Sequence, residues 1–205
     1  MPSTSVPLRF ARIPLSVAAL TIAAVSLGVS DARAQSAQPY SVQLAVLFTS
    51  FKNGSSSSIG GTGVEPQFRL NRLYSTEEFG ALSLGIGGQY TSHSSGGQTL
   101  TITGVFLEPR WVPAIRSSYV APYLSGRLAF LHQSNNFGSS SSGNGFGAGG
   151  GLAIKLTKTT NLDAGVQLVR QTFGDIRLTA GNASRTFQPF TTYAAKVGIS
   201  LGFPR

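Results

Sequence analysis

The sequence predicts an all-β protein, an eight-stranded antiparallel up-and-down transmembrane β-barrel. The clearest observation is the last segment, 193–203, where every second residue is apolar or aromatic and the residues between are mostly small or polar. Successive side chains of a strand point to opposite faces, so this strand has one apolar face. Similar alternation occurs eight times along the chain. After residue 35, Gly, Ser, Thr and Gln interrupt every apolar run well before the roughly 18 residues that a membrane helix needs.

Residues 1–34 form a predicted cleaved signal peptide. Arg9 and Arg12 give a positive start, an apolar stretch follows over 13–29, and Ala32-Arg33-Ala34 supplies small residues at both cleavage positions. An uncleaved anchor helix is the alternative. The segment predicts export across the inner membrane.

Residues 35–205 form the predicted barrel domain. Removing 34 of 205 residues leaves 171, the size of one domain, and because the leader holds three arginines and one aspartate, the charge of +9 becomes +7. The chain has no cysteine, which removes disulfide scaffolds, Cys-ligated zinc and thiol catalysis. His93 and His132 are far apart in sequence, so we expect no metal site and no cofactor.

The first four predicted strands show the alternation in turn. In the fourth the contrast is weaker, because Ile102 and Phe106 fall on the opposite face. The alternating positions are Tyr40, Val42, Leu44, Val46 and Phe48; Val64, Pro66, Phe68 and Leu70; Leu82, Leu84, Ile86 and Tyr90; and Thr101, Thr103, Val105, Leu107, Pro109 and Trp111.

The last four predicted strands follow the same period, and an even total is typical of closed single-chain barrels. Pro66, Pro109 and Pro122 cannot donate to a strand ladder, so we expect them near strand ends, where a bulge is tolerated. The alternating positions are Val120, Pro122, Leu124, Leu128 and Phe130; Phe146, Ala148, Leu152, Ile154 and Leu156; Leu162, Ala164, Val166 and Leu168; and Tyr193, Ala195, Val197, Ile199, Leu201 and Phe203.

The connections between these strands alternate in length, as expected when long external loops alternate with short periplasmic turns. This order places both chain termini in the periplasm. The long connections are 52–63, 92–98, 133–144 and 174–189, and the short ones are 74–78, 113–118 and 157–160.

Aromatic residues fall at the ends of the predicted strands, which indicates two bands at the membrane interfaces. The set at the periplasmic end is Tyr40, Tyr74, Phe79, Trp111, Tyr119 and Phe203, and the set at the outer end is Phe48, Tyr90, Phe130, Phe146 and Tyr193.

Charged residues of the opposite parity should face the lumen. An eight-stranded barrel is just wide enough for side chains to fill it, and buried charges persist only when they are paired, so we predict a plugged polar core. Glu108 and Arg110 are the expected centre of the network, with Arg69 and Arg127 as partners on other strands. A small gated ion path is the alternative. The predicted lumen charges are Glu65, Arg69, Glu108, Arg110, Arg127, Lys155, Asp163 and Lys196.

The segments 104–111 (GVFLEPRW), 121–126 (APYLSG) and 193–203 resemble the small outer-membrane β-barrel family of the OmpX and OmpA transmembrane-domain type. The resemblance implies a location in the outer membrane of a Gram-negative-type bacterium. It also implies that the last strand is the signal read by the barrel-assembly machinery. The assembly-signal residues would be Tyr193, Val197, Ile199, Leu201 and Phe203.

The segment His132-Gln133-Ser134-Asn135 resembles the His-x-Ser-Asn segment of outer-membrane lipid A deacylases. There the His acts as general base on the Ser and an acidic residue orients the His. In this chain no Asp or Glu occurs between Ser134 and Asp163. We therefore expect a structural or surface-binding protein without catalytic residues, with an acyl hydrolase using His132 and Ser134 as the alternative.

The expected partners are outer-membrane lipid and lipopolysaccharide. Lys52, Arg177 and Arg185 fall in or beside predicted external loops, where they could meet lipopolysaccharide phosphates. The cations are dispersed rather than gathered on one face, so nucleic acid is not expected as a partner. We expect a monomer.

Overall fold

The computed structural model describes residues 38–53, 57–95, 97–115, 119–136, 138–174, 176–177, 184–185 and 189–203. The predicted signal peptide lies outside these residues. No helix within the described ranges is long and apolar enough to cross a membrane.

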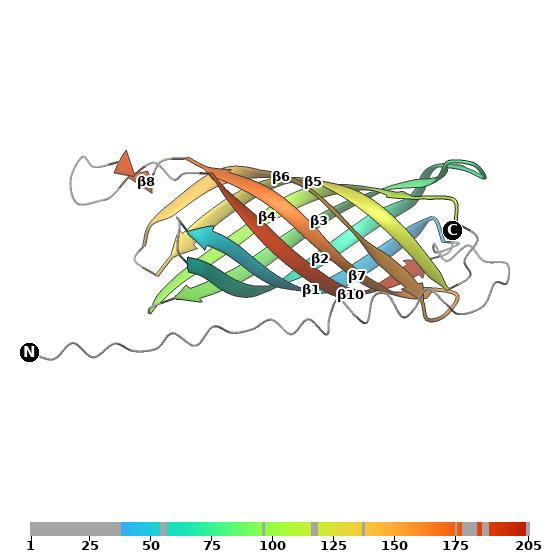
Figure 1. Cartoon of the computed structure of the whole chain (residues 1–205), viewed down its shortest axis with the longest axis horizontal. Coiled ribbons are helices and arrows are strands. Elements are labelled where there is room, and N and C mark those ends of the chain that lie inside the picture. The colour runs from blue at the N-terminus through green and yellow to red at the C-terminus, as the bar shows by residue number, and fades with distance from the viewer. Residues whose placement is uncertain are drawn as a thin grey trace, which may run out of the picture.

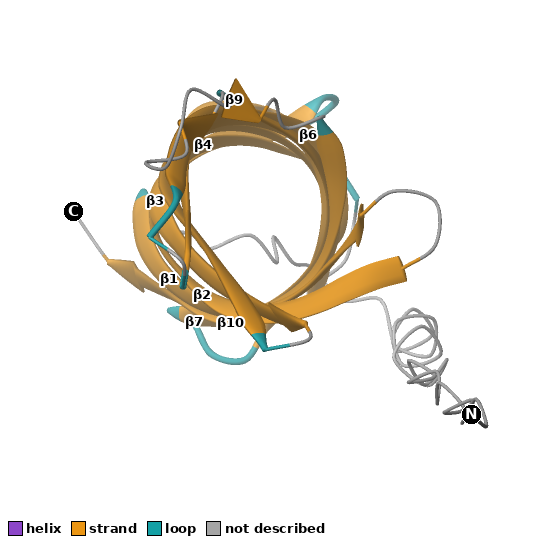
Figure 2. Ribbon diagram, turned by 90° about the vertical axis from the view of Figure 1, so that its left-hand side faces the viewer, coloured by secondary structure: helices purple, strands orange, loops and turns teal. Residues whose placement is uncertain are grey.

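Eight long strands close into one ring, and each pairs antiparallel with its neighbours in sequence (Figures 1 and 2). The ring closes because the first and last long strands pair, with Tyr40 opposite Phe203. The predicted fold class is confirmed. The long strands are β1 (Tyr40–Asn53), β2 (Ser57–Thr76), β3 (Gly80–Ser95), β4 (Gln98–Val112), β5 (Val120–Asn135), β6 (Ser140–Lys155), β7 (Thr160–Phe173) and β10 (Phe190–Phe203).

A separate two-stranded hairpin, β8 (Ile176–Arg177) with β9 (Ser184–Arg185), lies in the connection between β7 and β10. This hairpin is at the end of the barrel opposite the paired residues Tyr40 and Phe203 (Figure 1). We call the end with Tyr40 and Phe203 the termini end, and the other the far end.

Inward and outward positions alternate as the sequence predicts. In β5, for example, Tyr123 and Arg127 are buried in the lumen, whereas Leu124 and Leu128 are exposed on the outside. Ile102 and Phe106 point inward, as their parity requires. The outer surface is therefore a continuous apolar band, which is far larger than the exposed patches of water-soluble monomers.

The two predicted aromatic sets lie on the outside at the two ends. At the termini end, Tyr40 and Phe68 stack with ring centroids 6.1 Å apart, and Trp111 is half-buried and donates its indole N–H to the Phe79 carbonyl oxygen at 2.9 Å. At the far end, rings such as Phe130 and Tyr193 are exposed. This arrangement matches two interfacial bands around an apolar belt.

The predicted alternation of connection lengths is wrong. Strands β3 and β4 continue through the predicted 92–98 loop, and β5 and β6 take up most of 133–144. The reason is that ladder hydrogen bonds come from the backbone, so Ser- and Gly-rich segments can pair without apolar side chains. Between the long strands that the structure describes, the predicted external connection that stays long is the one after β7, 174–189.

The strand pairing is interrupted at two prolines, Pro109 and Pro66. The pairing of β4 with β5 is interrupted at Pro109, whose ring lies against Gly126; a Cβ placed on Gly126 would come 3.3 Å from the Pro109 Cγ. Pro66 lies in the interior of β2 rather than near a strand end, and the same register places Gly88 of β3 opposite it. Proline lacks the N–H that a central strand donates, which accounts for both interruptions.

A charge in the middle of the outer surface should destabilise the barrel. Leu44, midway between Tyr40 and Phe48 on β1, is 60% exposed. We expect Leu44→Arg to lower the free energy of unfolding in phospholipid vesicles by roughly 2–4 kcal/mol, because the guanidinium would lie near the bilayer midplane.

The matched control is Thr62→Arg, which is outward-facing on β2 and pairs with Phe48 at the level of the far aromatic band. Its cost should be about 0–1 kcal/mol. Equal costs for both variants, measured by urea titration, would contradict an apolar belt bounded at Phe48.

Candidate functional site

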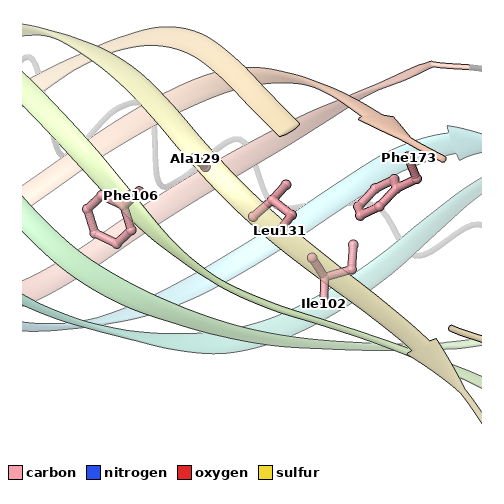
Figure 3. Close-up of a cluster of buried hydrophobic side chains, with 5 residues drawn as sticks. All are labelled: Ile102, Phe106, Ala129, Leu131 and Phe173. Carbon is pink, nitrogen blue, oxygen red and sulfur yellow. The ribbon is translucent and has the colours of Figure 1, made fainter. Parts of the chain in front are cut away.

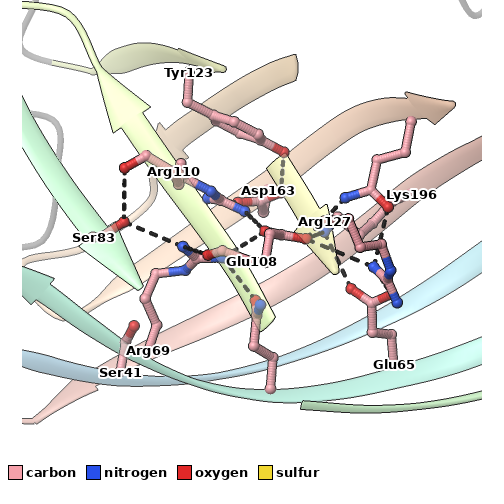
Figure 4. A network of polar contacts seen from close by, with 12 residues as sticks. Ser41, Glu65, Arg69, Ser83, Glu108, Arg110, Tyr123, Arg127, Asp163 and Lys196 are labelled. Atoms are coloured by element: carbon pink, nitrogen blue, oxygen red, sulfur yellow. Dashed lines mark hydrogen bonds and ion pairs between the residues drawn. The ribbon is translucent and has the colours of Figure 1, made fainter. Parts of the chain in front are cut away.

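The centre of the lumen is the Glu108 carboxylate on β4, which is completely buried. Lys196 on β10 donates to Glu108 Oε2 at 2.9 Å, and Arg110 donates to Glu108 Oε1 at 3.1 Å (Figure 4). Arg69 on β2 donates to the same Oε1 at 2.5 Å. Arg127 on β5 lies 3.7 Å from Oε2. One carboxylate therefore connects four strands.

Glu65 on β2 holds a second part of the network. Its Oε2 accepts a hydrogen bond from Arg127 at 2.7 Å, and its Oε1 accepts one from Lys196 at 3.1 Å. Because β2, β5 and β10 are not neighbours in the ring, these contacts cross the lumen.

Asp163 on β7 holds the third part. It accepts a hydrogen bond from Arg110 at 2.5 Å and one from the Tyr123 hydroxyl at 2.7 Å. The Arg110 guanidinium also lies over the Tyr123 ring, 3.7 Å from its centroid. Space for this ring comes from Gly151 and Gly165, where an added Cβ would be 2.6 and 2.5 Å from the Tyr123 hydroxyl oxygen.

Glutamine side chains link the charged groups. Arg127 donates to Gln167 at 3.1 Å and to Gln89 at 2.6 Å, and Gln167 in turn donates to Glu108 at 2.8 Å. The network contains three carboxylates, Glu65, Glu108 and Asp163, against four cations, so its formal charge is +1. Every one of these charges has an opposite charge or hydrogen-bond partner, as burial in a low-dielectric interior requires.

Apolar side chains point into the lumen towards the far end. Ile102, Phe106, Ala129, Leu131 and Phe173 form a buried cluster (Figure 3). The Arg127 guanidinium stacks over the Phe106 ring at 3.7 Å, which joins this cluster to the ionic network.

His93 is the buried histidine of the far half. Its Nε2 lies 2.8 Å from the Thr49 hydroxyl oxygen, and its ring meets Phe51 edge-on. Beside it, a cavity of about 20 Å³ reaches down to Glu65 and Arg127. A cavity of that size holds about one water molecule.

The structure brings together seven of the eight lumen residues predicted from sequence. Lys155 is the exception: it is half-buried at the termini end of β6, and it makes no ion pair within the described ranges. Sequence reasoning missed Tyr123 and Ser83, which contact Asp163 and Arg69. Strand parity is the signal that could have found Tyr123, since it shares the inward face of β5 with Arg127.

The alternative catalytic pair lies outside the lumen. His132 is exposed on the outer face of β5, and its Nδ1 is 3.1 Å from the hydroxyl oxygen of Ser142 on β6. Its described hydrogen-bond partner is thus Ser142, not Ser134. None of the carboxylates in the described residues contacts His132, so the described geometry lacks an acidic third member. No group of three or more His, Asp or Glu side chains among the described residues is arranged to hold a metal ion.

The predicted assembly-signal residues all lie on the outer face of β10. Tyr193, Val197, Ile199, Leu201 and Phe203 are exposed, and β10 pairs with β1 on one side and β7 on the other.

No family model and no curated protein matches the chain. Solved structures do match. Neisserial surface protein A superposes with a TM-score of 0.56 at 17% identity, over 86% of this chain and 100% of that one. The chain has the fold of the small outer-membrane β-barrels. This confirms the resemblance to the OmpX and OmpA type at the level of the fold.

Two further barrels have lower scores. Ail, the attachment invasion locus protein of Yersinia pestis, has a TM-score of 0.48 at 12% identity, covering 80% of this chain and 97% of its own. The N-terminal β-barrel domain of Pseudomonas aeruginosa OprF has a TM-score of 0.42 at 14% identity, covering 81% and 98%.

Removing the charge of Glu108 should destabilise this outer-membrane-type barrel strongly. In Glu108→Gln, Arg69, Arg110 and Lys196 lose their shared carboxylate while staying buried, and breaking a buried ion pair in this way costs about 3–5 kcal/mol. Urea unfolding in vesicles measures the loss.

Lys155→Met is the matched control, because this lysine lies outside the network; its effect should stay within about 0.5 kcal/mol. The double variant Glu108→Gln with Lys196→Met should recover part of the lost free energy of unfolding, since it removes one of the buried cations that Glu108 no longer neutralises. No difference between Glu108→Gln and Lys155→Met would show that the network does not stabilise the barrel.

Proposed function

We propose that the protein is an outer-membrane barrel of a Gram-negative-type bacterium, with a closed lumen and a structural or surface-binding role rather than a catalytic one. The observation that carries this proposal is the ionic network around Glu108, which joins β2, β4, β5 and β10 across the lumen. The apolar outer surface supports a lipid environment, and the fold shared with Neisserial surface protein A supports the outer membrane.

The way the network is built supports a closed lumen. Opening a path for ions would require at least one of Arg127 or Lys196 to leave Glu65 and Glu108. Each departure would leave a buried carboxylate with fewer partners, which is strongly unfavourable. A gated channel is therefore the less supported function.

The proposed orientation places the termini end in the periplasm and the far end outside the cell. The assembly machinery would then read the outer face of β10 from the periplasm, where Phe203 lies at the termini end. The far end would meet lipopolysaccharide, and the barrel would act as a monomer.

Wild-type protein in a planar bilayer should show no stable unitary openings, because side chains fill the lumen. The variant Glu65→Ala with Arg127→Ala removes one charge of each sign and a stacked guanidinium. We expect measurable conductance from this variant. Stable openings of the wild type would overturn the closed lumen.

Surface labelling of introduced cysteines tests the orientation. The sequence has no cysteine, so the introduced residue is the one thiol that can react. Ser95→Cys at the far end of β3 should react with a membrane-impermeant maleimide on intact cells. Lys158→Cys, in the turn between β6 and β7 at the termini end, should react only after the cells are broken. The reverse result would place the termini outside.

The acyl-hydrolase alternative is tested by incubating the refolded barrel with lipid A. We expect no released fatty acid, because His132 is paired with Ser142 and no carboxylate among the described residues orients it. Release that disappears in His132→Ala would restore the enzyme as the function.

A further inference from the structure

The outer face of the barrel carries a shallow, open groove of about 580 Å³ over β4 to β7 and β10. Its sides are large apolar residues, Pro109, Leu128, Phe146 and Leu168, and it also includes Gly126 and Ala148.

Strand register explains the hollow. Gly126, Ala148 and Leu168 lie in one row across β5, β6 and β7, and the next row towards the far end is Leu128, Phe146 and Arg170. Gly126 has no side chain and Ala148 has only a methyl group. The surface is therefore recessed at this row, between the larger side chains around it. The groove therefore runs from the far aromatic band down into the apolar belt.

Arg170 lies at the end of this groove that is nearer the far end of the barrel. It is exposed, and its backbone pairs with Phe146 on one side and Thr191 on the other. Its side chain makes no ion pair or hydrogen bond within the described ranges. No carboxylate of the described residues neutralises it from outside: Glu65, Glu108 and Asp163 are buried in the lumen, and Glu77 and Glu78 belong to the β2–β3 turn at the termini end.

We propose that this groove binds a phosphorylated lipid, with one acyl chain over Gly126 and Ala148 and a phosphate on Arg170. A guanidinium binds phosphate through paired charge-assisted hydrogen bonds, and the Thr191 hydroxyl on the same row is a second donor. The bound lipid would then have the orientation of a lipid in the membrane leaflet at the far end of the barrel. Its headgroup would lie at the aromatic band, and its acyl chain would point towards the bilayer midplane.

The occupant is the lipid A part of lipopolysaccharide. This choice rests on the proposed orientation, which puts the far end in the outer leaflet, where lipid A is the phosphorylated lipid. The groove itself requires only an acyl chain and an anion, so phosphatidylglycerol is the competing source of the same chemistry.

Native mass spectrometry of the refolded full-length barrel tests the site by titration with lipid A, phosphatidylglycerol and phosphatidylcholine. We expect one lipid A to be retained preferentially, with apparent affinity reduced about ten-fold in Arg170→Gln and by a similar factor in Gly126→Leu, which fills the groove. The matched control is Gly88→Leu, since Gly88 faces outward opposite Pro66 as Gly126 faces outward opposite Pro109.

Several outcomes would overturn the proposal. Equal retention of lipid A and phosphatidylcholine would reject Arg170 as an anion site. If Gly88→Leu weakened lipid A binding as much as Gly126→Leu does, the groove would be rejected as the binding site. Preference for phosphatidylglycerol would reject lipid A as the occupant. A lipid-independent dimer that Gly126→Leu abolishes, seen by analytical ultracentrifugation, would show that a second copy fills the groove instead.

The experiments distinguish a failure of the proposed lipid site from a failure of the proposed function. Labelling of Ser95→Cys on intact cells together with no lipid A binding would reject the groove alone. Lipid A binding without that labelling would keep the site and reject the orientation.

Discussion

The structure depends on the burial of one carboxylate, Glu108, among cations from four strands. In the low-dielectric interior of the barrel an unpaired Glu108 would be very unfavourable, and so would each unpaired arginine. The strands that carry these groups must therefore stay in one register. The lumen and the backbone ladder thus impose the same geometry, one through side chains and the other through the pairing of strands around the closed ring.

The outer face obeys a different constraint. There the side chains need only be apolar between the two aromatic bands, and large and small residues can alternate freely. That freedom allows a hollow at Gly126 and Ala148 beside a charged residue, Arg170, at the band. The inside is constrained by the pairing of charges, whereas the outer face is free of that constraint.

Much of this fold follows from alternation alone. The period of two in β10 and β5 predicts the strands, and the same parity assigns Glu65, Asp163 and Lys196 to the lumen. The loops were harder, because polarity does not stop a backbone ladder, and β5 and β6 continue through Ser- and Gly-rich sequence. Lys155 shows the other limit: parity gives the face of a residue, but not its height along the barrel, and at the termini end it is too far from the carboxylates.

The unequal number of acidic and basic groups in the lumen has a consequence for permeation. With four cations against three carboxylates, the ionic network in the lumen keeps an excess of one positive charge. Any water file that formed there would meet an electrostatic barrier to sodium, potassium and hydronium ions, while small anions would be opposed less.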